Sequence, residues 1–272
     1  MNTKALLVGI NKYPDPRNSL RGCINDILDL ECFISDKNKV YAKEHIKKLT
    51  DQQATKKGIL QQIEWLIKDA TPGDQLLFHY SGHGAQAPTL HTAIEKDGLD
   101  EIICPYDFNG TNETMIRDKE FVSLFASIPK GVHFIWISDS CHAEDLSRDP
   151  FITGEIGYRN FMGSSFTTLN KNQALKTRET LKLPVMIKSL PLNGALLSAC
   201  ESDQLSTDAI INKRYNGAFT HYLIENLIMH GANKPMELII KLVNVDLKHN
   251  GYDQIAQSEG ALTHKTFFNT QL

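Results

Sequence analysis

Two stretches of the chain share one pattern, in which a largely apolar run stops abruptly at a cluster of small, polar and reactive residues. Residues 132–137 lead into Ser138-Asp139-Ser140-Cys141-His142, and residues 75–80 lead into Ser81-Gly82-His83-Gly84. Apolar runs of this kind are typical of strands that are covered on both faces, and open α/β sheets carry their chemistry just past the carboxyl ends of such strands. The pattern therefore predicts one strand that ends in a thiol and another that ends in an imidazole.

Hydrophobic periodicity along the rest of the chain predicts an alternation of strands and helices. Residues 143–192 have little such period, and a stretch of that kind in a compact domain is typical of a functional or disordered loop. A polar loop is expected from Ala85 to Lys96. The further predicted strands are 4–10, 45–49, 194–199 and 266–269. A first helix is predicted to turn Ile24, Ile27, Leu28 and Ile34 toward the core. The other predicted helices are 55–69, 118–127, 217–229 and one that begins at Pro235.

Composition narrows the class of protein. A chain of 272 residues with 41% hydrophobic residues fits one large α/β domain. The chain has 29 basic and 32 acidic residues, so its net charge of −3 gives no reason to expect nucleic acid or an anionic membrane as a partner. The five cysteines are odd in number and scattered, which favours reduced thiols. Without a signal-peptide pattern or an apolar run of ~20 residues, the sequence predicts a soluble cytoplasmic protein.

The cysteine and the histidine at the two strand ends are more informative together than either is alone. A single cysteine is more often a small buried hydrophobe than a nucleophile, and a single histidine is more often structural. Here His83 precedes Cys141 by 58 residues, and both follow strand-like runs at equivalent positions. Peptide hydrolysis by a cysteine needs a thiolate, a nearby imidazole and donors for the tetrahedral oxyanion. The pattern favours a Cys-His pair of that kind.

The tetrads Ser81-Gly82-His83-Gly84 and Asp139-Ser140-Cys141-His142 look like the two catalytic motifs of the metacaspases, the caspase-like cysteine proteases of plants, protists and bacteria. The resemblance covers most of residues 4 to 230 in the family's order. It implies an α/β fold: a caspase-like three-layer sandwich, with about six mostly parallel strands and helices on both faces. Further segments that carry the resemblance are Lys4–Asn11, Leu20–Asp26, Asp97–Asp107, Leu196–Gln204 and Asn216–Thr220.

The same resemblance implies one peptidase domain over residues 1–272. Residues 1–142 are similar to the caspase large subunit, 143–192 to the linker, and 193–272 to the small subunit. Within this domain, Cys141 is expected to be the nucleophile and His83 its base, with the backbone N–H groups of Gly84 and Cys141 as the oxyanion donors. His142 is expected to support the structure.

The family's cleavage after Arg or Lys depends on acids in the pocket that receives the substrate side chain. Asp26 and Asp139 match those acids, and Cys23 and Ser81 match lining positions. Two carboxylates at the base of a narrow pocket favour a guanidinium or ammonium group through charge-assisted hydrogen bonds. The alternatives stay open that Asp26 only supports a helix end and that Asp139 only caps a strand.

The expected partners are protein or peptide substrates with a basic residue before the cleaved bond, and the expected state is a monomer. The linker itself offers basic residues to such an enzyme, so self-cleavage there is a hypothesis; equally, these charges could solvate a loop. The basic residues in question are Arg148, Arg159, Lys171, Lys176, Arg178, Lys182 and Lys188.

No cofactor is expected to be required for the chemistry, but many metacaspases are activated by calcium. The acids that resemble the family's calcium ligands are Asp97, Asp100 and Asp118, joined by Asp145 or Asp149. This chain has Asp118-Lys119 where the family commonly has two adjacent acids, and a lysine opposes a divalent cation. Calcium ions take six to eight oxygen ligands. The alternative is that these acids are ordinary solvated loop charges.

Two rival functions remain at this point. One is a related protease of separase-like or gingipain-like type, with a different substrate preference. The other is an inactive family member that acts as a scaffold or regulator. The chain also departs from the family at Ala143-Glu144, where Ser-Gly is usual. The presence of both Cys141 and His83 argues against inactivity.

Overall fold

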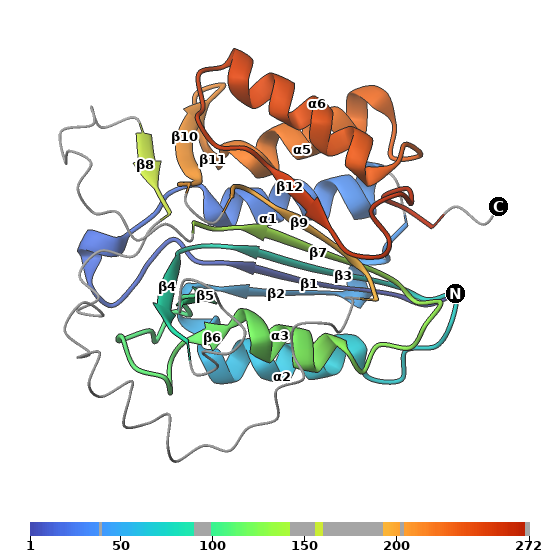
Figure 1. Ribbon diagram of the computed structural model, residues 1–272, viewed down its shortest axis with the longest axis horizontal. Helices are drawn as coiled ribbons and strands as arrows, with labels where there is room; N and C mark the ends of the chain where they lie inside the picture. The colour runs from blue at the N-terminus through green and yellow to red at the C-terminus, as the bar shows by residue number, and fades with distance from the viewer. Residues whose placement is uncertain (38–39, 90–98, 142–155, 160–192, 202–203, 270–272) are drawn as a thin grey trace.

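A six-stranded sheet forms the centre of the computed structural model, which describes residues 1–37, 40–89, 99–141, 156–159, 193–201 and 204–269. Its neighbouring strands are parallel except at one edge, where β12 runs antiparallel to β9 (Figure 1). This arrangement confirms the predicted fold class. In spatial order the strands are β12 (Gln257–Glu259), β9 (Ala195–Ser198), β7 (His133–Asp139), β3 (Gln75–Ser81), β1 (Thr3–Gly9) and β2 (Ile46–Thr50).

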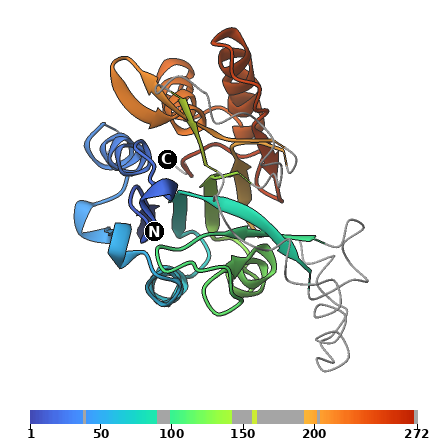
Figure 2. The ribbon, with the colours of Figure 1, turned by 90° about the vertical axis from the view of Figure 1, so that its left-hand side faces the viewer.

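Helices cover both faces of this sheet (Figures 1 and 2). One face carries α1 (Cys23–Glu31), α5 (Ala218–His230) and α6 (Met236–His249), and the other carries α2 (Lys56–Ile67) and α3 (Asp118–Phe125). A π-helical turn, Cys32–Lys37, continues α1. Three short 3-10 turns lie at Pro16–Asn18, Lys43–His45 and Asp51–Gln53.

The apolar strands form this sandwich because successive side chains point to opposite faces of the sheet. In β7, Ile135 and Ile137 join the core beneath α1, α5 and α6, whereas Phe134 and Trp136 join the core beneath α2 and α3. The second core is rich in aromatic rings, and the rings of Phe121 and Trp136 lie 4.8 Å apart. Burial on both faces explains why these strands are continuously apolar.

Two small sheets lie at the carboxyl ends of the parallel strands, the end that faces the viewer in Figure 2. The sequence pattern did not predict them, and residues 85–88 belong to a strand although a polar loop was expected there. One sheet contains β4 (Gly84–Pro88), β5 (Leu99–Ile103) and β6 (Ile116–Arg117). The other contains β8 (Ile156–Tyr158), β10 (Thr207–Ile211) and β11 (Arg214–Gly217).

The predicted strand at residues 266–269 is wrong. Phe267 and Phe268 are buried core residues that pack against the ring of Phe33, and Thr266 forms only an isolated bridge with Pro235. The edge strand is instead the polar β12. In the described part of the chain, no helix is both long and apolar enough to cross a membrane.

Candidate active site

The two motifs, the second described as far as Cys141, follow neighbouring strands because β3 and β7 pair in register. Ser81 lies opposite Asp139, so His83 and Cys141 each follow their strand by two residues. The backbones approach so closely there that a Cβ atom on Gly84 would lie 2.0 Å from the carbonyl oxygen of Cys141. Only glycine, which has no side chain, fits that position.

His83 is fixed by contacts on its backbone and its ring. The hydroxyl of Tyr13 accepts a hydrogen bond from the His83 backbone N–H at 3.0 Å, and the hydroxyl of Tyr80 donates to the His83 carbonyl at 2.7 Å. The ring atom Nε2 lies 2.8 Å from the carbonyl oxygen of Asn18. Because a carbonyl can only accept, Nε2 carries the proton of the neutral ring and Nδ1 keeps its lone pair.

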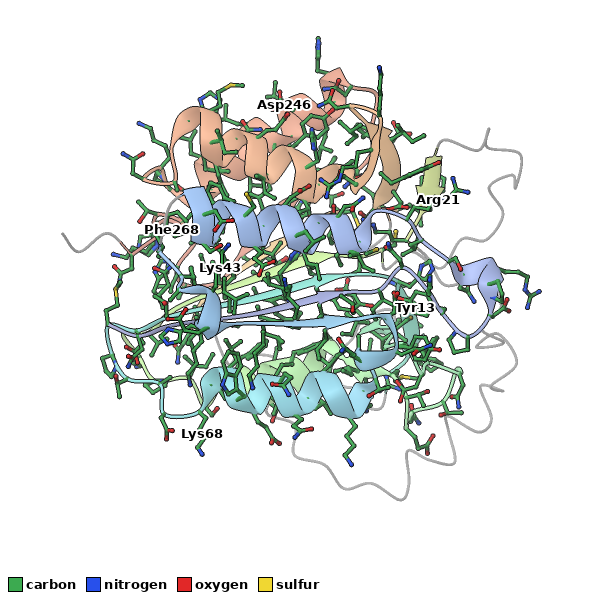
Figure 3. All side chains as sticks on the ribbon, turned by 180° about the vertical axis from the view of Figure 1, so that it is seen from behind. Tyr13, Arg21, Lys43, Lys68, Asp246 and Phe268 are labelled. Atoms are coloured by element: carbon green, nitrogen blue, oxygen red, sulfur yellow. The ribbon has the colours of Figure 1, made fainter. Side chains whose placement is uncertain are left out.

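The protonation state of His83 follows from its burial. Burial lowers the pKa of His83 to about 4, although the carbonyl of Asn18 and the backbone of Arg159 oppose this shift. The imidazole is therefore neutral at pH 7 and able to accept a proton at Nδ1. Figure 3 shows this end of the molecule through Tyr13, which bonds the His83 backbone and lies at the opposite end from Phe268.

Cys141 lies just past the end of β7 and is fully buried. Its Sγ atom accepts a hydrogen bond from the backbone N–H of Ser206 at 2.7 Å and lies 3.2 Å from the carbonyl oxygen of the same residue. Burial raises the pKa of the Cys141 thiol, and the backbones of Ser206 and Arg159 oppose that shift. The thiol is thus contacted by backbone groups beside the strand ends.

Besides Ser206, the short segment that ends at Arg159 brings its backbone to the thiol. Strand β8 pairs antiparallel with β10, and the backbone N–H of Arg159 donates to the carbonyl of Ser206 at 3.1 Å. The carbonyl oxygen of Arg159 accepts a hydrogen bond from the backbone N–H of Gly84 at 3.1 Å. The side chains of both His83 and Cys141 also contact the backbone of Arg159. The carbonyl of Arg159 therefore lies at the candidate oxyanion donor, and the backbone of the same residue contacts both the candidate nucleophile and the candidate base.

The side chain of Arg159 fills a buried acidic pocket. Its Nη2 lies 2.7 Å from a carboxylate oxygen of Asp26 and 3.1 Å from one of Asp208. Its Nη1 lies 3.1 Å from a carboxylate oxygen of Asp139, 3.0 Å from the carbonyl of the same residue, and 2.7 Å from the hydroxyl of Ser81. The side chains of Asp26, Asp139 and Arg159 are fully buried. The acids expected to bind a basic side chain thus surround one.

Cys23, the fourth expected pocket residue, is also in place. It is the first residue of α1, it is fully buried, and its thiol interacts with the hydroxyl of Ser81. Burial raises the pKa of this thiol, and the charge of Arg159 opposes the shift. Cys23 is therefore a neutral wall of the pocket.

Helix termini and backbone donors hold the two expected acids in position. Asp26 lies in the first turn of α1 and accepts hydrogen bonds from the Gly217 backbone N–H and from the Asn216 amide. Asp139 accepts two bonds from Thr220, in the first turn of α5, where the helix dipole also favours a negative charge. Burial raises the pKa of Asp26 to about 6, although Arg159 opposes the shift, so this carboxyl is largely ionised at pH 7.

Asp208 is a third pocket acid, which sequence reasoning missed. It lies on β10 and accepts backbone hydrogen bonds from Arg21 and Gly22, in the loop that leads into α1. A Cβ atom on Gly22 would lie 2.4 Å from its carboxylate. Asp208 therefore joins the strand that pairs with β8 to the helix that supplies Asp26.

Asp100 and Asp118, the two expected calcium ligands that the structure describes, are arranged around cations of the chain itself. Both oxygen atoms of Asp100 are bonded to cations, one to Lys119 Nζ and the other to Arg117 Nη1 at 2.7 Å. Asp118 lies 3.5 Å from the same Lys119 nitrogen. Among the residues that the structure describes, no group of three or more His, Cys, Asp or Glu side chains could hold a metal ion. The remaining residues of that expectation, Asp97, Asp145 and Asp149, lie outside the described residues, as does His142.

The mostly parallel sheet, its two helical layers and a cysteine just past the end of β7 are those of a caspase-like α/β protein. Comparison with known proteins gives the family. The model of the metacaspase, peptidase C14 domain, matches residues 3–148. Metacaspase-1 of Coccidioides immitis is 33% identical over 89% of this chain and 57% of its own length. Metacaspase-1 of Candida albicans is 33% identical over 97% of this chain and 66% of its own length. The chain belongs to the metacaspase family, a family of cysteine peptidases.

A solved structure supports the fold independently of these sequences. Protein GSU0716 from Geobacter sulfurreducens superposes with a TM-score of 0.68 over 98% of this chain and 97% of its own, at 23% identity. That identity bears on the fold alone. The chain spans from 57% to 66% of the length of the two Metacaspase-1 relatives.

Proposed function

We propose that the chain is a cysteine endopeptidase that cleaves peptide bonds after arginine or lysine, with Cys141 as nucleophile and His83 as general base. The observation that carries the proposal is the position of Arg159. Its side chain fills the acidic pocket while its carbonyl oxygen accepts the Gly84 N–H. A peptide substrate would bind in the same way, with its backbone paired to β10 as β8 is.

These contacts support a two-step mechanism. His83 Nδ1 takes the thiol proton, and the thiolate attacks the carbonyl carbon of the basic residue. The backbone N–H of Gly84, together with that of Cys141, stabilises the negative oxygen of the tetrahedral intermediate. The imidazolium then gives its proton to the leaving amine, and water activated by the same imidazole hydrolyses the thioester.

The pocket also supports a preference between the two basic side chains. Arg159 uses both terminal nitrogens, with Nη1 bonded toward Ser81 and Asp139 and Nη2 toward Asp26 and Asp208. A lysine ammonium is a single nitrogen and cannot reproduce this fork. We therefore expect arginine to be preferred over lysine.

The same pose supports self-cleavage at one particular bond. Among the basic linker residues, Arg159 is the one that lies in the described part of the chain, and it occupies the pocket. Its own carbonyl accepts the N–H of Gly84, the proposed oxyanion donor, and this contact supports the bond after Arg159 as the one that is cut. The monomeric state and the cytoplasmic location stay predictions.

The first prediction concerns the catalytic pair. Cys141→Ala should reduce hydrolysis of an arginyl fluorogenic peptide to background, and His83→Ala should reduce kcat/KM by about 10²- to 10⁴-fold, because general base catalysis is lost. Cys32→Ala and His45→Ala, which change a thiol and an imidazole outside the site, are the matched controls and should keep activity. Retained activity in Cys141→Ala would exclude the proposed nucleophile.

The second prediction concerns self-cleavage. On incubation, intact mass should show two fragments whose boundary is Arg159–Asn160, because the Arg159 carbonyl accepts the N–H of Gly84, the proposed oxyanion donor. Cys141→Ala should remain whole, and Arg159→Gln should lose this cut while Arg148→Gln keeps it. An unchanged mass in the active protein, or a boundary after another basic residue, would contradict the assignment.

The third prediction concerns Asp208. Asp208→Asn should lower kcat/KM for an arginyl peptide by about tenfold or more, because a charged hydrogen bond to Nη2 is lost. The value for the lysyl peptide should fall less, so the arginine-to-lysine ratio measured on paired peptides drops. Asp253→Asn, an exposed acid on the same half of the chain, is the control. An unchanged ratio in Asp208→Asn would show that this carboxylate does not select arginine.

A further inference from the structure

A buried ionic cluster joins the three strands of the β4–β5–β6 sheet. At its centre is Asp100 on β5, whose side chain is fully buried, and the partner side chains of Arg117 and Lys119 are only 8% and 7% exposed. Arg117 belongs to β6, and Lys119 belongs to the first turn of α3. The positive charges that neutralise Asp100 are thus supplied by the chain itself.

Arg117 extends this cluster to β4. Its Nη1 donates to the carbonyl of Pro88, the last residue of β4, at 3.1 Å, and its Nη2 donates to the side chain of Asn112 at 2.7 Å. In the strand register, Asp100 lies opposite Ala87 on β4. The cluster therefore fixes the far end of β4 against β5 and β6.

The near end of the same sheet carries the proposed catalytic groups. Gly84, which opens β4, lies opposite Ile103 on β5, and the backbone N–H of Cys104 donates to the carbonyl of His83 at 2.9 Å. A shift of β4 along β5 would move the Gly84 N–H away from the Arg159 carbonyl, to which it donates a hydrogen bond. Reactions of this kind are sensitive to such shifts, and a displacement of about 1 Å can cost about a hundredfold in rate.

A divalent cation at this place would meet opposing charge. The ammonium of Lys119 lies against both Asp100 and Asp118, and the guanidinium of Arg117 takes the second oxygen of Asp100. Calcium would have to displace both cations before it could collect oxygen ligands. These residues are therefore unsuited to calcium in two ways: positive charges already occupy the site, and the described residues there offer too few oxygen ligands.

We propose that Lys119, together with Arg117, acts as a built-in cation that fixes the β4–β5–β6 sheet, so that this chain needs no divalent cation for activity. Lys119 is a positioning residue, because it acts through the sheet and does not touch the reacting atoms. The activity part of the inference rests on the proposed peptidase function, whereas the fixing of the sheet does not.

The experiment compares the full chain in calcium chloride and in EGTA, with two readouts: hydrolysis of the arginyl peptide and thermal unfolding. For the wild type, kcat/KM and Tm should be the same in both buffers. Loss of activity in EGTA that calcium restores, or a rise of Tm with calcium chloride, would overturn the proposal. If the wild type cleaves no peptide in either buffer, the proposed function fails, and the Tm comparison still decides whether calcium binds.

Variants at Lys119 test the positioning role. Lys119→Met keeps the length of the side chain but removes its charge, so kcat should fall about 10- to 100-fold with KM little changed, because the pocket is untouched. Lys119→Arg should recover most of kcat, and Lys57→Met, at an exposed helix position, should match the wild type. Full kcat in Lys119→Met, or a failure of Lys119→Arg to recover what Lys119→Met loses, would contradict the role of the charge.

If Lys119→Met does not fold, the calcium dependence of Lys119→Arg, which retains the charge, is measured in its place. A folded Lys119→Arg that needs calcium for activity would overturn the built-in cation, and one that is independent of calcium would support it.

Discussion

The burial of charge beside the end of β7 is the constraint on which the rest of the site depends. Carboxylates removed from water are costly unless they are paired and bonded. Asp26, Asp139 and Asp208 meet this requirement with backbone N–H groups, hydroxyls and one guanidinium. A pocket of this composition favours a side chain that is cationic and planar. It disfavours an acidic or apolar side chain, which would leave the carboxylates without a positive partner.

The fold delivers these charges from distant parts of the chain to one place. Asp139 comes from a central strand, Asp26 from the first turn of α1, and Asp208 from a small sheet at the carboxyl ends of the parallel strands. Asp208 lies on the strand that also pairs with β8. In the proposed function, binding of a peptide backbone and binding of its basic side chain would therefore be coupled through one strand.

Much of the sheet and part of the site could be predicted from sequence, because burial on both faces leaves continuous apolar runs such as those before Ser81 and Ser138. Asp26, Ser81 and Asp139 were expected in one pocket through motif resemblance, and they lie together around Arg159. Asp208 was missed because its partners are backbone groups of Arg21 and Gly22, which are distant in sequence. The short strand β8 was missed because it owes its form to pairing with β10. The two buried phenylalanines at 267 and 268 were mistaken for a strand, since apolar content alone does not distinguish pairing from packing.

The most direct test of the account is the rate at which an arginyl chloromethyl ketone alkylates Cys141, measured on the wild type and on Arg159→Ala, with the labelled thiol identified by peptide mapping. If Arg159 occupies the substrate pocket beside the nucleophile, removal of its side chain should raise the second-order rate constant, with the label on Cys141. An equal rate in the two proteins, or a label on another cysteine, would contradict the account.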